Sequence, residues 1–365
     1  LKTTDESGWI HFMADLPISA KYYLKEIYAP NGYVRGTETQ EFTFEYQGDK
    51  TTQAVYEFTF EDVQTSVELS KADLTDGKEL PGASLQVLDS NGTVVEEWIS
   101  TDEPHLIRGL LVGETYTMVE TKPADGYTTA ESIEFKVEDT AEVQKHQMLD
   151  DVTKVEISKT DVTDSKEVPG AKLTILDKDG KVVESWVSKK DPHMVEKLPV
   201  GTYTLREEQA PDGYLVAEEV SFEVKDTGEI QKVEMKDARP VGKLVLKKTD
   251  AEDGSPLAGA EFELRIKKSG KVVATLVTDE EGVATSGDIP IASYKDGKMK
   301  KEIEYILVET KAPDGYVRSE KEESIVFTYQ DDKTKEIEIT KELTNERIPT
   351  GDYVKSPKTG DDTNI

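Results

Sequence analysis

The stretch VELSKAD, residues 67–73, decides how this chain folds. Its apolar and polar residues alternate, which is typical of a β-strand with one buried face. Side chains two residues apart point the same way, so Val67 and Leu69 share that face with Lys71. The strand therefore aims a lysine at its own core, where an unpaired charge is strongly unfavourable.

The same pattern recurs twice, in VEISKTD (155–161) and LVLKKTD (244–250), which turn Lys159 and Lys248 inward. A repeat of this kind must be recognised first, because it sets the fold of the whole chain. Lys247 beside Lys248 leaves a register slip open, and the alternation favours Lys248 as the inward residue.

A tyrosine-led strand ending in a Pro and Asp-Gly or Asn-Gly turn occurs four times. Alternation puts one glutamate of each copy on the apolar face: Glu26, Glu120, Glu207 and Glu309. A closing strand follows each copy and ends on an inward carboxyl or amide: Asp62, Asp150, Asp237 and Asn345. Asp151 beside Asp150 leaves a second register slip open, and parity again favours the earlier residue.

These markers divide the chain into an N-terminal segment (1–64), module one (65–152), module two (153–240), module three (241–347) and a polar tail (348–365). About seven short strands in ~90 residues indicate a β-sandwich. The N-terminal segment is expected to be the C-terminal half of a truncated module that lacks the lysine strand. Residues 286–304 are expected to be an inserted loop or hairpin. We expect an all-β chain of tandem sandwiches in an elongated array.

Composition excludes several function classes. The chain has 365 residues with 45 Lys and Arg against 75 Asp and Glu, a formal charge of −30. This acidity argues against nucleic-acid binding and against binding to an anionic membrane surface. There are no cysteines, so disulfides cannot hold the modules together. The chain has no signal peptide and no apolar run long enough to span a bilayer, so we expect a fragment of a longer secreted precursor.

Three inward polar groups per module suggest chemistry. An apolar pocket lowers the pKa of a lysine and raises that of a carboxyl. A neutral lysine amine is a nucleophile, and a nearby glutamate can act as general acid and base. The amine is then predicted to attack the Asp or Asn side chain and form an isopeptide bond, with loss of water or ammonia. The open alternative is a hydrogen-bonded network without a covalent bond.

The motif Y-x-L-x-E-T-x-A-P-x-G-Y resembles the E-box of the collagen-adhesin B-type (Cna-B), or SpaA-like, prealbumin-like repeats of Gram-positive surface proteins and pilins. Modules one and two are most similar to the isopeptide-forming domain used in SpyCatcher. The resemblance implies bonds Lys71–Asp150, Lys159–Asp237 and Lys248–Asn345, assisted by Glu120, Glu207 and Glu309. Module two departs from the motif with Glu208 where threonine is usual, and module one exchanges Pro and Ala in KPADGY.

The tail contains SPKTG, which resembles the sortase signal L-P-x-T-G with serine in the first position. Its residues are Ser356, Pro357, Lys358, Thr359 and Gly360. Cleavage is expected between Thr359 and Gly360, with transfer of Thr359 to peptidoglycan or to a pilus subunit. The hydrophobic span and basic tail of such signals are not in this chain, which agrees with a fragment.

The sequence thus predicts an extracellular, cell-wall-anchored stalk, adhesin or pilus component, self-crosslinked and not an enzyme. It implies no cofactor and no metal site; the partners are sortase, the attached wall or pilus, and a host extracellular ligand. One alternative is a set of ligand-binding modules without crosslinks, with the 286–304 insertion as the contact surface. Another is a glycosidase using paired carboxylates, which the inward parity and repetition of those groups disfavour.

Overall fold

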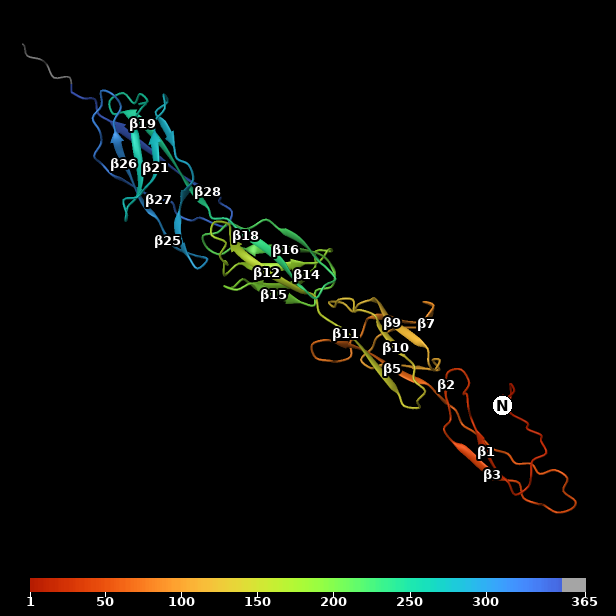
Figure 1. Cartoon of the computed structure of the whole chain (residues 1–365). Coiled ribbons are helices and arrows are strands. Elements are labelled where there is room, and N and C mark those ends of the chain that lie inside the picture. The colour runs from red at the N-terminus through yellow and green to blue at the C-terminus, as the bar shows by residue number, and fades with distance from the viewer. Residues whose placement is uncertain (350–365) are drawn as a thin grey trace, which may run out of the picture. The chain divides into compact units, whose positions relative to one another are not determined.

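A computed structural model describes residues 1–349, and over this range the chain is built from strands and loops without a helix (Figure 1). It forms two compact units. The first comprises 1–154 with 196–200 and 225–229, and the second comprises 155–195, 201–224 and the described residues from 230 to 349. No helix of the described range could cross a membrane. The predicted all-β, tandem-sandwich fold is confirmed.

Module one is a sandwich of two sheets. Its strands are β5 (Ser66–Asp73), β6 (Ser84–Leu88), β7 (Val94–Ile99), β8 (His105–Arg108), β9 (Thr115–Lys122), β10 (Ile133–Lys136) and β11 (Gln144–Asp150). One sheet has the order β10-β9-β6-β7 and the other β11-β5-β8. The first and last strands, β5 and β11, pair in parallel, with Lys71 opposite Met148 and Asp73 opposite Asp150.

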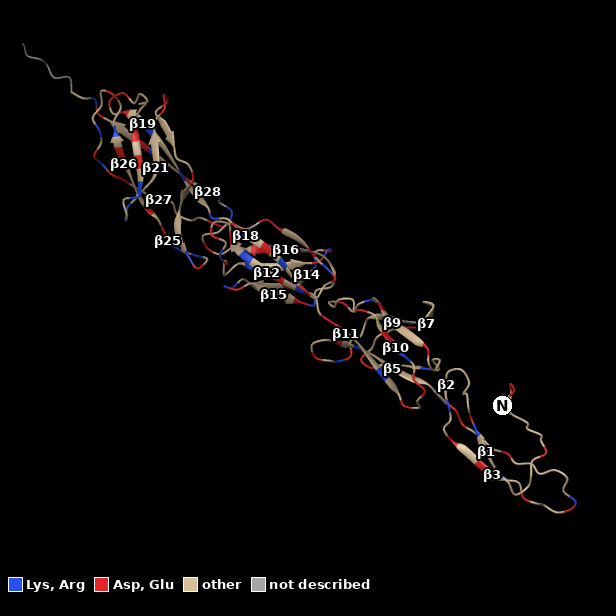
Figure 2. Ribbon diagram, in the orientation of Figure 1, with Lys and Arg blue, Asp and Glu red and all other residues tan. Residues whose placement is uncertain are grey.

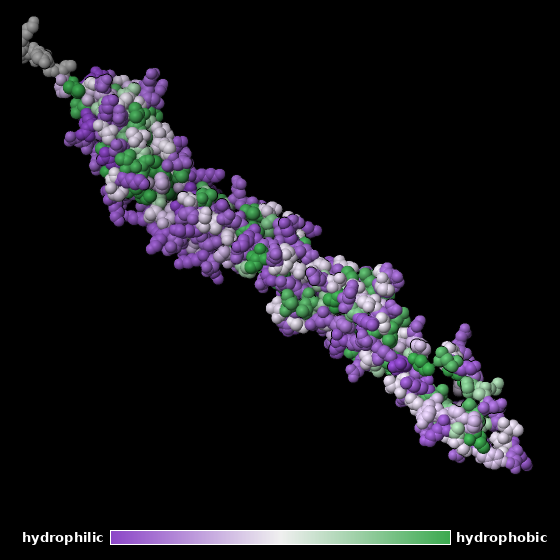
Figure 3. Space-filling model, viewed as in Figure 1, coloured by the Kyte–Doolittle hydropathy of each residue, from purple (hydrophilic) through white to green (hydrophobic). Residues whose placement is uncertain are grey.

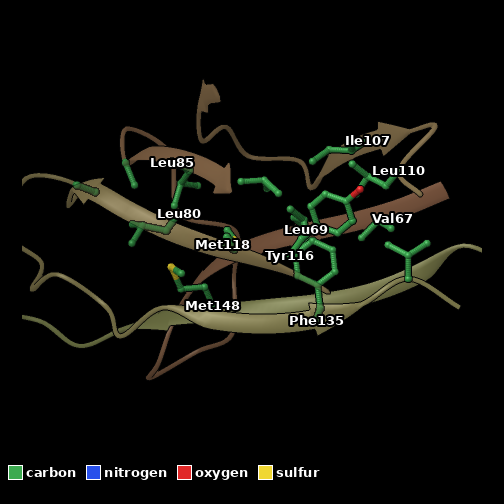
Figure 4. Close-up of a cluster of buried hydrophobic side chains, with 14 of the residues drawn as sticks. Val67, Leu69, Leu80, Leu85, Ile107, Leu110, Tyr116, Met118, Phe135 and Met148 are labelled. Carbon is green, nitrogen blue, oxygen red and sulfur yellow. The ribbon is translucent and has the colours of Figure 1, made fainter. Parts of the chain in front are cut away.

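The core of module one follows the alternation of its strands (Figure 4). Val67 and Leu69 of β5 face Tyr116 and Met118 of β9, and Met148 of β11 completes this layer. All five side chains are buried, and the intervening residues point outward. Burial of such apolar surface is the main favourable contribution to folding. Lys71 extends the same buried row and is itself about 1% exposed.

Module two repeats this topology. Its strands are β12 (Lys154–Asp161), β13 (Lys172–Leu176), β14 (Val182–Val187), β15 (His193–Glu196), β16 (Gly201–Gln209), β17 (Val220–Val224) and β18 (Ile230–Asp237). The sheet orders are β14-β13-β16-β17 and β15-β12-β18. The first and last strands are therefore neighbours again.

Module three keeps the sandwich and adds a hairpin. Its strands are β19 (Val241–Asp250), β20 (Glu261–Ile266), β21 (Val272–Val277), β22 (Val283–Thr285), β23 (Ile289–Pro290), β24 (Ala292–Lys295), β25 (Lys298–Glu302), β26 (Glu304–Lys311), β27 (Glu323–Val326) and β28 (Glu336–Asn345). One sheet has the order β21-β20-β26-β27, and β19 pairs with β22, β23 and, in parallel, β28. The insertion forms the antiparallel pair β24–β25.

The N-terminal segment forms only two small sheets. Strand β1 (Lys21–Lys25) pairs with β3 (Thr39–Thr43), and β2 (Tyr33–Val34) pairs with β4 (Val63–Gln64). The alternation of Phe58, Phe60 and Asp62 predicts a closing strand, but the structure assigns no strand there. The reason is the missing partner: in the whole modules this strand pairs with the lysine strand, and a lone strand has no ladder to join.

The face of the molecule in Figure 3 is largely hydrophilic, with smaller hydrophobic patches between the hydrophilic residues. Acidic and basic residues are both spread along the strands and loops (Figure 2). This distribution agrees with the excess of 75 acidic over 45 basic residues in the sequence.

Candidate crosslink sites

Each whole module buries one lysine on its first strand. Lys71 lies on β5, Lys159 on β12 and Lys248 on β19, and each side chain is about 1% exposed. The alternation that buries Val67 and Leu69 places Lys71 in the same row. Lys247 is half-exposed and pairs with Glu342 at the surface, so it does not enter the core.

A glutamate on the facing sheet contacts each lysine. The distance from the lysine Nζ to the glutamate Oε is 2.9 Å at Glu120, 3.2 Å at Glu207 and 3.4 Å at Glu309. These glutamates lie on β9, β16 and β26, opposite the lysine strands across the sandwich. The inward face predicted from the tyrosine strands therefore meets the inward face of the lysine strands.

The loop after each glutamate strand fixes the carboxylate. A backbone N–H ten residues later donates to the glutamate Oε2, over 2.6 Å from Ala130, 2.7 Å from Ala217 and 2.5 Å from Ser319. Charge-assisted hydrogen bonds of this kind are about twice as strong as neutral ones. The glutamate is thus held by its own E-box loop as well as by the lysine.

The closing strand brings the third group. Lys71 Nζ contacts Asp150 Oδ1, and Lys159 Nζ contacts Asp237 Oδ1. Both aspartates are fully buried. The first and last strands are neighbours in both modules, and in module one they run in parallel, so Lys71 and Asp150 project from adjacent strands toward each other. Asp151, the other candidate in module one, instead pairs with Lys154 at 2.9 Å.

Module three shows a variant of this arrangement. Asn345 Nδ2 donates to Glu309 Oε2 over 3.1 Å and to the Val317 carbonyl over 2.6 Å. Lys248 Nζ donates to the backbone carbonyl of Thr344 over 2.9 Å. The amine therefore lies next to the residue that precedes Asn345, with Glu309 between the two side chains.

Burial shifts the protonation of these groups toward the neutral forms. It raises the pKa of Asp150 to about 7 and that of Asp237 to about 7, although the neighbouring lysines oppose the shift. It lowers the pKa of Lys248, against the opposing charge of Glu309. A neutral carboxyl is the electrophile that an amine needs, and a lowered lysine pKa increases the fraction of free amine.

One oxygen of each buried aspartate on the closing strands β11 and β18 has no hydrogen-bond partner within residues 1–349. Asp150 Oδ2 and Asp237 Oδ2 are buried and make no hydrogen bond there. Asn345 Oδ1 is in the same condition. Buried polar atoms without partners are costly and rare in stable proteins. A reaction that removes the oxygen or converts the group to an amide would relieve this cost at Asp150 and Asp237.

The N-terminal segment contains two of the three groups. Glu26 Oε2 accepts from the Gly36 N–H over 2.6 Å, which is the same ten-residue contact seen in the whole modules. Asp62 is half-buried, and its Oδ1 is buried without a hydrogen-bond partner among the described residues. The third group is absent, because this segment has no counterpart of the first strand that carries the buried lysine in the whole modules. The E-box loop can therefore position its glutamate without the lysine strand.

A second repeated cluster escaped the sequence reasoning. In each of the three whole modules, the last tyrosine of the E-box donates its hydroxyl to the aspartate two residues after the buried lysine. The pairs are Tyr127–Asp73 at 2.7 Å, Tyr214–Asp161 at 2.7 Å and Tyr316–Asp250 at 2.8 Å. Its sequence signal was available, because an aspartate follows every buried lysine at the same spacing and every E-box ends in tyrosine.

A cation completes each of these Asp–Tyr clusters. Lys197 Nζ lies 2.6 Å from the Tyr127 hydroxyl, Arg239 Nη2 lies 2.6 Å from Asp161, and Arg347 Nε lies 2.6 Å from Asp250. Hydrogen bonds and these cations hold the aspartate pKa values low against the effect of burial. The cluster ties the end of the E-box to the lysine strand, two residues from the buried lysine.

The remaining sequence candidates have structural roles or lie elsewhere. His105 stacks on Trp98 and His193 on Trp186, with ring centroids 4.4 Å apart in both cases. No group of three or more potential metal-ligating side chains occurs within the described part of the chain. The predicted sorting residues 356–360 lie outside the described residues.

Comparison with known proteins identifies the repeat. The family model of the SpaA prealbumin-like fold domain matches four segments, residues 2–57, 65–151, 153–239 and 242–343. A search of curated proteins found no match.

Several solved structures are similar to the chain. The TIE protein of Bacillus anthracis is 27% identical with a TM-score of 0.52, over 78% of this chain and 52% of that one. The chain thus spans about half the length of that relative. BcpA, the major pilin subunit of Bacillus cereus, is 19% identical with a TM-score of 0.44, over 78% and 99% of the two chains. The shaft pilin SpaA of Lactobacillus rhamnosus GG is 15% identical with a TM-score of 0.26, over 48% and 97%.

Proposed function

Because this chain belongs to the SpaA prealbumin-like family, we propose that it is a surface stalk, part of an adhesin or pilus, whose modules crosslink themselves through isopeptide bonds. The observation that carries the proposal is the buried lysine, glutamate and aspartate or asparagine found in all three whole modules. Buried charges rarely stabilise a fold by themselves, so their threefold repetition favours a chemical role.

The reaction in modules one and two would be a condensation. The neutral lysine amine attacks the side-chain carbon Cγ of the protonated aspartate, and a bond from Nζ to Cγ forms. The glutamate takes a proton from the amine and delivers it to the departing Oδ, which leaves as water. For Lys71 and Asp150 the contact already present supplies the proximity that a bimolecular reaction lacks.

Module three would lose ammonia instead of water. The Lys248 amine attacks Cγ of Asn345, so that a bond from Nζ to Cγ forms and the bond from Cγ to Nδ2 breaks. Glu309 takes a proton from the amine and delivers it to Nδ2, which leaves as ammonia. The hydrogen bond from Asn345 Nδ2 to Glu309 Oε2 places the acid next to this leaving group. Each module reacts once, so the protein is not a turnover enzyme.

The crosslinks would make the stalk resist extension. Lys71 is on the first strand of module one and Asp150 on the last, and these strands lie side by side. A pulling force would pass through the bond, and residues 72–149 would never extend. Without the bond, each residue released adds roughly 3.3–3.6 Å of slack chain. A covalent closure of this length also stabilises the fold by about 4 kcal/mol through the unfolded state.

Attachment to the cell surface is the second part of the proposal. The SPKTG sequence at 356–360 would be the sortase recognition site, and Thr359 would be joined to peptidoglycan or to a pilus subunit. This assignment makes the protein extracellular and wall-anchored. It rests on the sequence motif together with the family of the preceding modules.

Intact mass of the full chain tests the crosslinks. We expect a deficit of two waters and one ammonia relative to the plain sequence. Glu120→Ala and Glu207→Ala should each restore one water, and Glu309→Ala should restore the ammonia. A wild-type mass equal to the plain sequence would show that the triads are hydrogen-bonded networks only and would refute self-crosslinking.

A further inference from the structure

We propose that the hairpin β24–β25 of module three is a docking element that grips the E-box turn of module two and joins the two modules into one rigid segment. Both modules contribute to the same compact unit, which contains 155–195, 201–224 and the described residues 230–349. This inference does not depend on the crosslinks, because it concerns a contact between modules and not the reaction within one.

Tyr294 at the tip of β24 makes the central contact. Its hydroxyl donates to the Gly213 carbonyl over 2.5 Å, and its ring packs edge-on against Tyr214 with centroids 5.2 Å apart. Together with Val168 and Ala210 these rings form a small apolar cluster. Burial raises the pKa of Tyr294 to about 12. Aromatic pairs of this kind contribute about 0.5–1.5 kcal/mol beyond the area they bury.

Arg239 connects the hairpin to the Asp–Tyr cluster of module two. Its guanidinium lies over the Tyr294 ring, 4.0 Å from the centroid, while its Nε donates to Asp161 over 2.7 Å. A cation held over a tyrosine face contributes about 0.5–2 kcal/mol. The arginine is therefore held by module two on one side and by the inserted hairpin on the other.

Two glycines permit the close approach. Gly213, in the E-box turn, has φ +89°, and a side chain there would meet Met299 Cβ at 2.6 Å. Gly297, in the hairpin turn, has φ +64°, and a side chain there would meet the Glu167 carbonyl at 2.1 Å. Each glycine has the backbone conformation that its turn needs and also leaves room for the other module.

A second contact lies outside the hairpin. The Tyr329 hydroxyl donates to the Tyr214 carbonyl over 3.1 Å, and the Val216 N–H donates to the Asp332 carbonyl over 2.8 Å. The E-box turn of module two is thus held from both sides by module three. Adjacent domains otherwise move relative to one another unless their interface is large and well packed.

The packing of segment 286–304 on module two indicates a structural role for the insertion. Tyr294 is the only aromatic residue of the segment 286–304, and it packs on module two. The structure therefore shows no exposed aromatic patch on this hairpin, which is the feature that would favour a ligand-binding role for the insertion. We infer that the insertion holds modules two and three together and does not bind a separate ligand.

Spin-label distances in the full chain test the joint. The chain has no cysteine, so Lys178→Cys and Lys268→Cys, both in exposed strand-connecting turns, can be labelled cleanly. We expect a narrow distance distribution in the parent. Tyr294→Ala and Gly297→Ala should each widen it at least about twofold, since an undocked module regains its freedom. Lys298→Ala, an exposed change on the same hairpin, is the matched control and should leave the width unchanged.

The alternative outcomes are distinct. A distribution that is already broad in the parent, or that stays equally narrow in Tyr294→Ala and Gly297→Ala, would overturn the proposal. Intact mass of every variant shows whether its crosslinks are unchanged, so failure of the joint and failure of the crosslinking reaction are separable. Exchange protection of the Val216 amide gives a second readout, which should fall in both hairpin variants and not in the control.

Discussion

Module one and the N-terminal segment share an E-box but differ in their lysine strand, and nearly every other difference follows from that. Module one buries a continuous apolar cluster around Met118 and Tyr116. In residues 1–64 Val34 is the only buried apolar side chain. Glu26 and Glu120 nevertheless accept the same backbone contact, from Gly36 and Ala130.

The comparison separates local from long-range determinants. The E-box loop is a local structure, because its glutamate and its donor are ten residues apart. The closing strand is a long-range structure, because it forms only beside the first strand. A lysine strand therefore contributes the ladder for the closing strand and the apolar row that seals the core. In the proposed reaction it also supplies the nucleophile.

Removing the buried lysine should make module one less stable, as the N-terminal segment without a lysine strand is less well packed. In Lys71→Met we expect one more water in the intact mass and a large loss of stability. The lost constraint on the unfolded chain accounts for about 4 kcal/mol. Glu120 and Asp150, left buried without a cation, add roughly 3–5 kcal/mol.

Calorimetry of the full chain beside intact mass measures both effects. Lys145→Met is the control, since this lysine is largely exposed and its side chain only pairs with Glu68. If Lys71→Met unfolds at the same midpoint temperature as the parent, neither the bond nor the buried pair stabilises the module.

A lysine strand supplied as a peptide should complete the site in the N-terminal segment. A peptide with residues 65–73, TSVELSKAD, added to the full chain should dock beside the closing segment and couple to Asp62. Its lysine would meet the prepositioned Glu26 and the unpartnered Asp62 carboxyl oxygen. Gel electrophoresis after boiling in detergent, followed by mass of the product, detects the adduct.

Two controls restrict the interpretation of that experiment. Asp62→Ala removes the acceptor and Glu26→Ala the proton shuttle, and both should abolish the adduct. A peptide in which methionine replaces the lysine should give none. If the parent chain yields no product resistant to boiling, the N-terminal segment does not form a competent half-site.

The sequence predicted the parts of the site that depend on alternation. Lys71, Glu120 and Asp150 were each expected to face inward, and the structure brings all three together. A period of two assigns a strand residue to a face without knowledge of its neighbours. The four-residue insertion strand β24 was likewise expected as part of a loop or hairpin.

What the sequence did not predict depends on contacts between distant turns. Tyr127 and Tyr214 lie in turns, where alternation gives no face, so their bonds to Asp73 and Asp161 were not foreseen. The docking of Tyr294 on module two was not foreseen because its partner, the Gly213 carbonyl, lies in a turn of another module, and alternation within a strand does not predict such a contact. The closing strand expected at Phe58–Asp62 fails because pattern alone cannot supply a partner strand.

The Asp–Tyr cluster gives a pH-dependent difference between the two regions. Burial raises the pKa of Asp73, but hydrogen bonds from Tyr127, Thr75 and Lys197 outweigh it and lower the value to about 2. A carboxyl whose pKa is lower in the folded state stabilises the fold above its unfolded value of about 3.9. This contribution is lost as the pH falls from about 4 to about 2.

Asp73→Asn should therefore flatten the acid limb of module one's stability profile. At pH 7 it should cost roughly 1.5–3 kcal/mol, as expected for a hydrogen bond to a charged group. Thermal unfolding between pH 2 and pH 7 measures both quantities. Tyr127→Phe keeps the carboxylate and should show a smaller loss at neutral pH. An Asp73→Asn profile parallel to the parent's would contradict the assigned role.

The smallest expected effect concerns the exposed ion pair between the first and last strands of module one. Lys145 Nζ lies 2.8 Å from Glu68 Oε1, and the two residues are directly opposite in the parallel ladder. In a crosslinked module the strands are held by the Lys71–Asp150 bond, so Lys145→Ala should cost only about 0.2–1 kcal/mol. The loss should vanish near 1 M salt, where screening acts within about 3 Å. In the Lys71→Met background the same change should cost more, because the ion pair then helps to hold strands that no bond joins. Equal costs in both backgrounds would show that strand pairing in module one does not depend on the crosslink, and the contrast with the N-terminal segment would then rest on the apolar row alone.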